Sequence, residues 1–301
     1  MLPHLSPYTV IKGKWNKKSY EVKKKLGEGG TGAVYLVRDI HLDREYALKL
    51  SEDNIAINRE FGLLKKFQNV KLVVKVYDMD DVEIQGKTLY YLLLEHIDGV
   101  NLQNYSENNL VSTKTVLGVI IVILDGLVKI HNMGYIMADL KLENIMLDRE
   151  KKKIKLIDLG GLVKKGEAIK EFTPSYDRAS WNCGDRIAET SYDLFLVIMI
   201  LVRLTINENL NPRKDTIETV INKIQKSSIH KDIKSFMIKG LLGKEKNIEK
   251  FSRRIKELYN KEKQIFKTNN VIKNPLNVDF FFICSCSLFI STLIFAYLNI
   301  R

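Results

Sequence analysis

Two short groups of polar residues near the middle of the chain constrain its fold more than any other feature. Asp139, Lys141 and Asn144 fall within six residues, and Asp158 follows nineteen residues after Asp139. Together they supply a carboxylate that only accepts hydrogen bonds, a cation, and oxygen ligands of the kind that Mg²⁺ prefers. These four residues are therefore candidates for the chemistry of the chain.

A glycine-rich run precedes this site in the chain. Gly27–Gly32 (GEGGTG) fits the pattern G-x-G-x-x-G, which two different nucleotide-binding folds share. In a dinucleotide-binding fold the run would open a helix, whereas Ala33–Val37 continues here as an apolar strand. The glycines are therefore predicted to form the turn of a hairpin, either an ordinary flexible turn or one whose bare backbone lies over phosphates.

A lysine and a glutamate follow the glycine run. Lys49 ends an apolar strand (Ala47-Leu48-Lys49), and Glu60 lies near the start of a helical pattern. A lysine in that place can reach phosphates while a carboxylate on a helix holds its ammonium group. Only ten residues separate the two. Because most Lys–Glu pairs lie on solvated surfaces, the alternative of an ordinary surface pair stays open.

The periodicity of apolar residues predicts strands first and helices later. The predicted strands are Tyr20–Leu26, Ala33–Arg38, Arg44–Leu50 and Thr88–His96, and the predicted helices are Asn54–Phe67, Thr113–Asn132 and Tyr192–Leu204. The last of these is apolar all round but too short to cross a bilayer, so we expect it to be a core helix.

The order of these motifs resembles the eukaryotic-like (Hanks-type) protein kinases, over about residues 20 to 260. The resemblance implies an α+β fold of two lobes, with an N-terminal antiparallel sheet plus one helix and a helical C-terminal lobe. It implies a phosphotransferase that uses ATP and Mg²⁺, with Mn²⁺ as an alternative ion. Asp139 would then be the catalytic base, Lys141 would steady the γ-phosphate, and Asn144 and Asp158 would hold the metal. An ATP-binding role is implied for Gly27, Gly29, Gly30, Gly32, Val34, Ala47, Lys49, Glu60, Glu95, Ile97 and Asp98.

Further matches extend the resemblance. Backbone groups of Glu95 and Ile97 would meet the adenine in the connection between the lobes, and Asp98 would reach the ribose. Thr173 matches the end of the activation segment. Asp193 matches a buried helix residue that holds the catalytic loop through hydrogen bonds, although an aspartate at a helix start is more often an N-cap. The Asp-x-Lys pattern favours Ser/Thr acceptors over Tyr.

The chain also departs from the family. Met137 and Ala138 stand where His and Arg usually precede the catalytic Asp, so the arginine that pairs with a phosphorylated activation loop is missing. The Ala-Pro-Glu that usually closes the activation segment is eroded to Ala179–Trp181, and no Gly follows Asp193. We therefore expect an unusual substrate platform and no ordering of the segment by phosphate through that arginine.

The net charge of +12 predicts attraction to phosphates. Residues 223–273 carry fifteen Lys or Arg against five Asp or Glu, which is a net +10. Within them, apolar residues at helical spacing predict an amphipathic basic helix. The candidate polyanion-binding residues, for DNA or anionic lipid, are Lys250, Arg253, Arg254 and Lys256. The alternative is that these charges form only a solvated face.

The nineteen uncharged residues Phe280–Leu298 predict one membrane-spanning helix, because about 1.5 Å per residue spans roughly the 30 Å hydrocarbon core. Lysines precede it, so the positive-inside rule predicts a cytoplasmic kinase domain held at the cell membrane by a C-terminal anchor. The three cysteines are too few for a disulfide framework and lack zinc-ligand spacing.

The expected organisation is an N-terminal extension (1–19), the N-lobe (20–95), the C-lobe (96–260), a basic juxtamembrane linker (261–279) and the transmembrane helix (280–298). This plan resembles the short kinases of spore-forming bacteria. Expected partners are proteins with Ser/Thr acceptors, membrane lipid, DNA, and a second copy for trans-autophosphorylation. Two alternatives stay open: a membrane-tethered pseudokinase that signals by binding, and a nucleic-acid-binding protein that uses the kinase fold as a scaffold.

Overall fold

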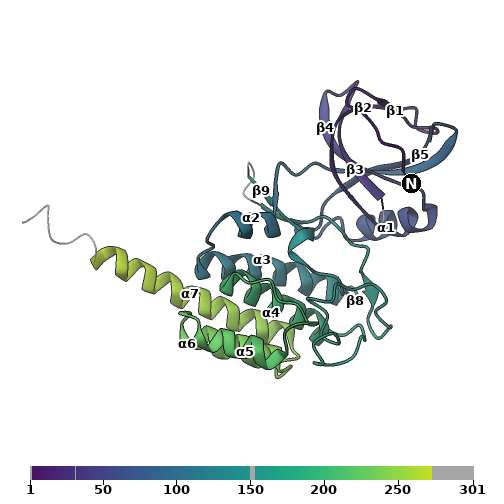
Figure 1. The fold of residues 1–301 in the computed structure, drawn as a ribbon. Helices are drawn as coiled ribbons and strands as arrows, with labels where there is room; N and C mark the ends of the chain where they lie inside the picture. The colour runs from purple at the N-terminus through teal and green to yellow at the C-terminus, as the bar shows by residue number, and fades with distance from the viewer. Residues whose placement is uncertain (1, 31, 150–152, 273–301) are drawn as a thin grey trace, which may run out of the picture.

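The computed structural model describes residues 2–30, 32–149 and 153–272, which form two lobes (Figure 1). The N-terminal lobe is a six-stranded sheet in the order β1-β2-β3-β4-β6-β5, and every neighbouring pair in it is antiparallel. Helix α1 (Asn54–Lys66) packs against β5 and β6. The strands are β1 (Val10–Lys12), β2 (Ser19–Gly29), β3 (Gly32–Asp39), β4 (Arg44–Ser51), β5 (Val76–Ile84) and β6 (Lys87–Glu95).

The four predicted strands and helix α1 are confirmed within a few residues at each end. Alternating burial explains the strands: Tyr20 and Val22 of β2 are fully buried, and the residues beside them are not. Helix α1 starts where the Asp53 carboxylate accepts a hydrogen bond from the Ala56 N–H at 3.0 Å. Glu60 lies on the buried face of this helix, which points the carboxylate into the lobe.

Two strands of the sheet were not predicted. β5 carries four acidic residues among its nine, which hides its apolar alternation. Asp80 of β5 is nonetheless buried, because its carboxylate accepts hydrogen bonds from the backbone N–H groups of Trp15 and Asn16. β1 lies within residues 1–19, and Ile11 is buried there. The segment expected to be an extension therefore completes the sheet of the N-lobe.

The C-terminal lobe is helical, as expected. Its helices are α2 (Leu102–Asn108), α3 (Thr113–Asn132), α4 (Thr190–Ile206), α5 (Ile217–Lys226), α6 (Lys231–Leu241) and α7 (Ile248–Ile272), with the short 3₁₀ helix η1 (Leu142–Asn144). Short strands line its upper side: β7 (Gly99–Asn101), β9 (Ile145–Asp148) and β10 (Lys153–Leu156) in one sheet, and β8 (Tyr135–Ile136) with β11 (Val163–Lys164) in another. Every residue from Tyr192 to Leu204 is buried, which confirms the predicted core helix.

The basic amphipathic helix is also confirmed. α7 packs against α3 and α4, and its apolar stripe is buried there: Ile248, Phe251, Ile255 and Leu258. The helix continues to Ile272, so the segment 261–279, expected to be a linker, begins inside α7. The predicted membrane span Phe280–Leu298 lies outside the described residues; among those that are described, no helix has both the length and the apolar character to cross a bilayer.

Candidate active site

The glycine-rich run forms the tip of the β2–β3 hairpin, where Gly29 pairs with Gly32. This confirms the predicted turn. A β-carbon on Gly32 would lie 2.2 Å from the Leu50 carbonyl oxygen, and φ there is +143°, so the fold itself requires glycine at this position. A β-carbon on Gly27, Gly29 or Gly30 would meet nothing within 4 Å. Those three glycines leave the backbone at the tip bare and open to a ligand.

Lys49 and Glu60 form the ion pair that the sequence left open. The Lys49 Nζ lies 2.6 Å from the Glu60 Oε2, and the side chains are only 10% and 8% exposed. Burial raises the pKa of Glu60 and the nearby Asp158 carboxylate raises it further, while Lys49 acts in the opposite direction. The Oε1 atom of Glu60 has no hydrogen-bond partner within the described chain. The ammonium group is thus fixed in a buried place that already holds two carboxylates.

Val34 and Ala47 share one face of the sheet with Lys49. Val34 lies opposite Lys49 in the β3–β4 register, and Ala47 is two residues before Lys49 on β4. Side chains two apart on a strand, and directly opposite on neighbouring strands, point to the same face. Both are half-buried, so they leave an apolar surface beside the lysine.

Asp139, Lys141 and Thr173 form a triangle of hydrogen bonds at the centre of the site. The Lys141 Nζ donates to the Asp139 Oδ2 at 2.7 Å and to the Thr173 Oγ1 at 3.1 Å. The Thr173 hydroxyl donates to the Asp139 Oδ1 at 2.7 Å. Thr173 thus ties the end of the activation segment to both catalytic-loop side chains. The sequence predicted all three residues but not this mutual contact.

Asp193 holds the catalytic loop from below. Its carboxylate, fully buried on α4, accepts hydrogen bonds from the backbone N–H groups of Met137 at 2.8 Å and Ala138 at 3.0 Å. The His131 Nε2 lies 2.7 Å from the same carboxylate. Ala138 has a φ of +60°, a strained left-handed conformation that costs of order 1 kcal/mol and that these bonds maintain. Asp193 therefore has the position predicted for it, and His131 is a partner that the sequence analysis did not single out.

Ala138 offers only a methyl group and no cation to the activation segment, but Arg59 of α1 reaches that segment. The Arg59 Nη2 donates to the Leu162 carbonyl oxygen at 3.0 Å, and its Nη1 lies 3.9 Å from the Glu171 Oε1. The Arg59 and Glu171 side chains are more than half exposed, so the ion pair is weak. The contact links α1 to the segment without a phosphate. In the sequence, the only indication of this contact was that Arg59 is a charged residue directly before Glu60.

Asn144 and Asp158 offer oxygen ligands at the edge of the catalytic loop. Asp158 accepts a hydrogen bond from the Gly160 N–H through Oδ1 at 2.7 Å. In the described part of the chain, neither the Asp158 Oδ2 nor the side-chain amide of Asn144 has a hydrogen-bond partner. A β-carbon on Gly161 would lie 2.5 Å from the Asp139 Cβ, so this turn passes directly beside the catalytic loop. Uncommitted carboxylate and amide oxygens fit Mg²⁺.

The connection between the lobes provides free backbone groups. Ile97 is buried, and neither its N–H nor its C=O forms a hydrogen bond with any described residue. Asp98 is exposed, and its carbonyl oxygen accepts from the Arg149 N–H at 3.0 Å. The Glu95 side chain pairs with the buried Lys155 at 3.0 Å, which ties the connection to the strand before Asp158. Lys155 was not predicted, although its place between the apolar residues Ile154 and Leu156 of β10 was a signal.

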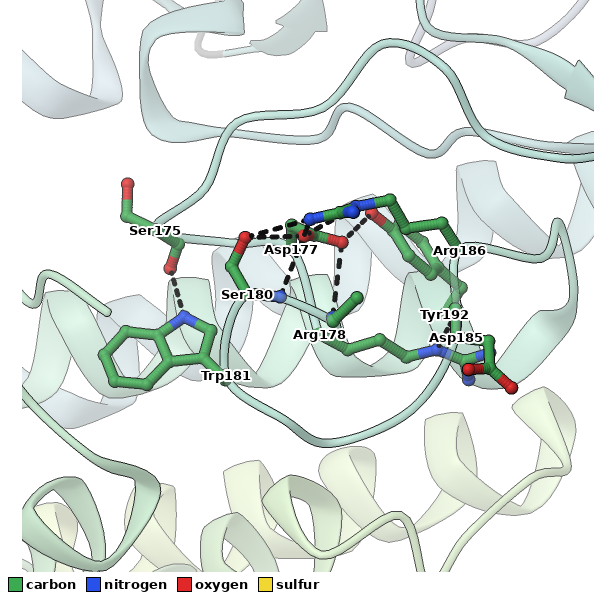
Figure 2. Close-up of polar contacts among 9 residues, drawn as sticks. Ser175, Asp177, Arg178, Ser180, Trp181, Asp185, Arg186 and Tyr192 are labelled. Carbon is green, nitrogen blue, oxygen red and sulfur yellow. Dashed lines mark hydrogen bonds and ion pairs between the residues drawn. The ribbon is translucent and has the colours of Figure 1, made fainter. Parts of the chain in front are cut away.

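The end of the activation segment is held by a substitute for the eroded Ala-Pro-Glu motif (Figure 2). The fully buried Asp177 accepts two hydrogen bonds from Arg186, through Nε at 3.0 Å and Nη2 at 2.8 Å. It also accepts from Ser180 and from the Tyr192 hydroxyl of α4. The sequence predicted that the loss at Ala179–Trp181 would alter this platform. It gave no indication that Asp177 takes over, because a lone Asp in a loop has many uses.

Arg178 binds the same platform to the start of α4. Its guanidinium donates to the Asp185 carbonyl, the Ser191 hydroxyl and the Glu189 carboxylate, at 2.7 to 2.8 Å. It also lies over the ring of Tyr192. The segment from 177 to 186 is thus anchored by two arginines.

The four candidate polyanion-binding residues lie on the exposed side of α7. Three of them pair with carboxylates: Lys250 with Glu245, Arg254 with Glu257, and Lys256 with Asp125. No described carboxylate pairs with Arg253. The structure therefore places these charges on a solvated, partly neutralised face, and it does not bring them to the site around Asp139.

Comparisons with known proteins agree with this geometry. The sequence model described as "Protein kinase domain" matches residues 20–268. The chain is 40% identical over 204 residues to the serine/threonine-protein kinase YabT of Bacillus subtilis, a match that covers 66% of this chain and 59% of YabT.

More distant relatives carry the same kind of name. The chain is 28% identical to the serine/threonine-protein kinase PrkC of Bacillus subtilis, over 50% of this chain and 24% of PrkC. It is 29% identical to the serine/threonine-protein kinase PknG of Mycobacterium leprae, over 68% of this chain and 27% of PknG. The chain thus spans three-fifths or less of the length of these curated relatives.

Proposed function

The chain belongs to the protein kinase family, and we propose that it transfers the γ-phosphoryl group of ATP to Ser and Thr hydroxyls of proteins. The observation that carries the proposal is the triangle of Asp139, Lys141 and Thr173. A carboxylate held by an ammonium group and a hydroxyl is fixed in orientation, which a base for proton transfer needs.

The roles follow from the positions of the side chains. Asp139 orients the acceptor hydroxyl and takes its proton as the phosphoryl group moves, and Lys141 offers its ammonium group to the charge that develops. Lys49, held by Glu60, binds the phosphates, and the bare glycine tip covers them. Asn144 and Asp158 would hold Mg²⁺, which supplies charge neutralisation at the phosphate oxygens when bound. Val34, Ala47 and the free backbone of Ile97 form the place for the adenine.

The role of the catalytic base is tested by replacing Asp139. The Asp139→Asn variant keeps the size of the side chain but loses the base, so we expect autophosphorylation to fall at least about a hundredfold. The exposed aspartate Asp185 gives a matched control, and Asp185→Asn is expected to retain the activity. Full activity in Asp139→Asn would overturn the assignment.

The two alternatives from the sequence have less support. The relatives named above are all called serine/threonine-protein kinases, which gives no support to a pseudokinase. A nucleic-acid-binding scaffold would depend on α7, where three of the four candidate basic residues already have carboxylate partners.

We further propose that the chain is anchored in the cell membrane by Phe280–Leu298, with the kinase domain on the cytoplasmic side. The support is the length of this uncharged segment and the lysines before it. The expected test outcome is that the full chain sediments with membranes after an alkaline wash, whereas a chain that ends at Asp279 does not. Release of the full chain by the wash would contradict the anchor. A role in sporulation is proposed from the resemblance to the short kinases of spore-forming bacteria.

We also propose that DNA or anionic lipid regulates the enzyme through α7. If Lys250, Arg253, Arg254 and Lys256 touch phosphates, replacing all four by Gln should lower the slope of log affinity against log salt by several units. The control replaces four exposed lysines of the N-lobe by Gln: Lys12, Lys17, Lys24 and Lys87. An equal slope in both variants would contradict the proposal.

We propose in addition that a second copy of the chain phosphorylates the first. This trans-autophosphorylation predicts that the rate of autophosphorylation per enzyme molecule falls when the enzyme is diluted.

A further inference from the structure

A pocket of about 410 Å³ lies beside the catalytic triangle. It is formed where α2, η1, the activation segment, α4 and the loop after α4 meet. The lining residues on which the argument depends are Gln103, Glu143, Arg203 and Arg213. Pro174, which also lines it, directly follows Thr173, whose hydroxyl donates to Asp139. Because an extended chain advances about 3.3–3.6 Å per residue, the pocket is within reach of a side chain a few residues from a phosphoryl acceptor.

Arg203 contributes a buried charge to this pocket. The residue is only 7% exposed, and its guanidinium lies over the ring of Tyr176 at 4.8 Å and donates to the Asn209 Oδ1 at 2.8 Å. The Arg203 Nε has no hydrogen-bond partner in the described part of the chain, and no described carboxylate forms an ion pair with the guanidinium. An amide and a ring supply dipoles but no net negative charge, and the end of α4 adds about half a charge at most.

A buried guanidinium without a carboxylate partner is energetically unfavourable. Buried charges in folded proteins are normally paired, because an unpaired one costs several kcal/mol of desolvation. A guanidinium offers its donors in a planar fork that matches a carboxylate. Arg203 is therefore a preformed half of an ion pair whose other half is not among the described residues.

The other charged residues of the lining leave its net charge positive. Arg213 is exposed at the pocket and its side chain has no partner in the described part of the chain. The side-chain Oε1 of Gln103 is also buried, and no described residue donates a hydrogen bond to it. The one carboxylate in the lining is Glu143, which is exposed to solvent and pairs with neither arginine. Two arginines against one solvated glutamate leave the pocket positive.

We propose that this pocket binds an acidic side chain of the protein substrate near the acceptor residue, so that the enzyme prefers Ser or Thr sites with a neighbouring Glu or Asp. The inference rests on the proposed function, since it names the class of substrate for the same site. Arg203 pairs with the substrate carboxylate from the floor of the pocket, and Arg213 pairs with it from the rim.

The test uses the full chain and a set of synthetic peptides. Each peptide is otherwise uncharged and carries one Glu, Gln or Lys, which is placed in turn at every position around a single Ser. At one nearby position we expect Glu to raise kcat/KM about tenfold over Gln, the size of one charge-assisted hydrogen bond. Lys at that position should be worse than Gln.

Three variants locate the preference. In Arg203→Gln the ratio of kcat/KM between the Glu and the Gln peptide should fall toward one. Because Arg203 is buried and its replacement can unfold the chain, Arg213→Gln at the exposed rim gives a second test, with a smaller fall of the same ratio. Lys214→Gln, an exposed residue of the same loop outside the lining, should keep both the ratio and the rate.

A binding measurement separates this proposal from the proposed function. Fluorescent copies of the peptides, with Ala in place of the acceptor Ser, report affinity without phosphoryl transfer. Tighter binding of the Glu peptide that is lost in Arg213→Gln supports the pocket even if no peptide is phosphorylated, and absent phosphorylation would then count against the proposed function alone. Equal affinity for Glu and Gln peptides at all positions would overturn the pocket. So would a preference for Lys that disappears in Glu143→Gln.

Discussion

Arg186 donates two hydrogen bonds to one oxygen of Asp177, Oδ2, and the Asp177 side chain is fully buried while that of Arg186 is 39% exposed. The pair closes the activation segment within nine residues of chain, where the family usually has an Ala-Pro-Glu motif. Figure 2 shows that the same carboxylate also faces Ser180 and Tyr192. One aspartate therefore organises the substrate platform.

Replacing this aspartate should weaken the fold. Asp177→Asn removes the charge that Arg186 meets and turns one acceptor oxygen into a donor, so we expect a loss of about 2–4 kcal/mol in the free energy of unfolding. Ser180→Ala removes one neutral partner and should cost about 1 kcal/mol. Urea denaturation of both variants measures the difference. Equal losses would contradict the central position of Asp177.

The same carboxylate predicts a pH dependence. Burial raises the pKa of Asp177, but hydrogen bonds from Ser180, Tyr192 and Arg186 together outweigh it and leave the pKa below its usual value of 3.8. A lowered pKa in the folded state stabilises the fold above the unfolded value and loses this contribution as the pH falls through the folded value. The difference in unfolding free energy between wild type and Asp177→Asn should therefore shrink below about pH 4. A difference that stays constant from about pH 4 down to pH 2.5, about one and a half units lower, would contradict the lowered pKa of Asp177.

Nucleotide-directed side chains should affect activity more than folding. Lys49→Ala and Asp158→Asn should each abolish autophosphorylation while thermal unfolding stays cooperative, because both side chains serve the nucleotide. Phosphate incorporation from ATP and the unfolding curve are measured on the same samples. Unchanged incorporation in either variant would show that phosphoryl transfer uses other residues.

Thr173 should act through position and not through charge. Its hydroxyl bridges Asp139 and Lys141, so Thr173→Ala should lower the rate of peptide phosphorylation about tenfold to a hundredfold. A Thr173→Glu variant should not restore the rate, because its carboxylate would lie against Asp139 and compete with it for the Lys141 ammonium group. Ala138 supplies no second cation there. Full activity in Thr173→Glu would identify charge as the switch.

The sequence predicted the parts of the fold and site that depend on local pattern. Strong alternation indicated β2, β3, β4 and β6, and the polar residues of the catalytic loop were recognisable because their types and spacing are required by the chemistry. The hydrogen bonds of Asp193 were predicted from the family resemblance, since a helix-start Asp alone indicates only a cap.

Long-range contacts explain what was missed. β5 has too many acidic residues to show a strand pattern, and its burial depends on the backbone of Trp15 and Asn16, more than sixty residues earlier. The lack of a described carboxylate that pairs with the guanidinium of Arg203 is equally invisible in the sequence. An arginine in an apolar helix looks the same whether or not a carboxylate lies opposite.

The most direct measurement of the central claim follows two labels on ATP. The full chain is incubated with Mg²⁺ and either γ-labelled or α-labelled ATP, and the labelled amino acid is identified after hydrolysis. Phosphoryl transfer by Asp139 predicts label from the γ position only, on Ser or Thr, and none in Asp139→Asn. Label from the α position, label on Tyr alone, or equal labelling of the Asp139→Asn variant would contradict it.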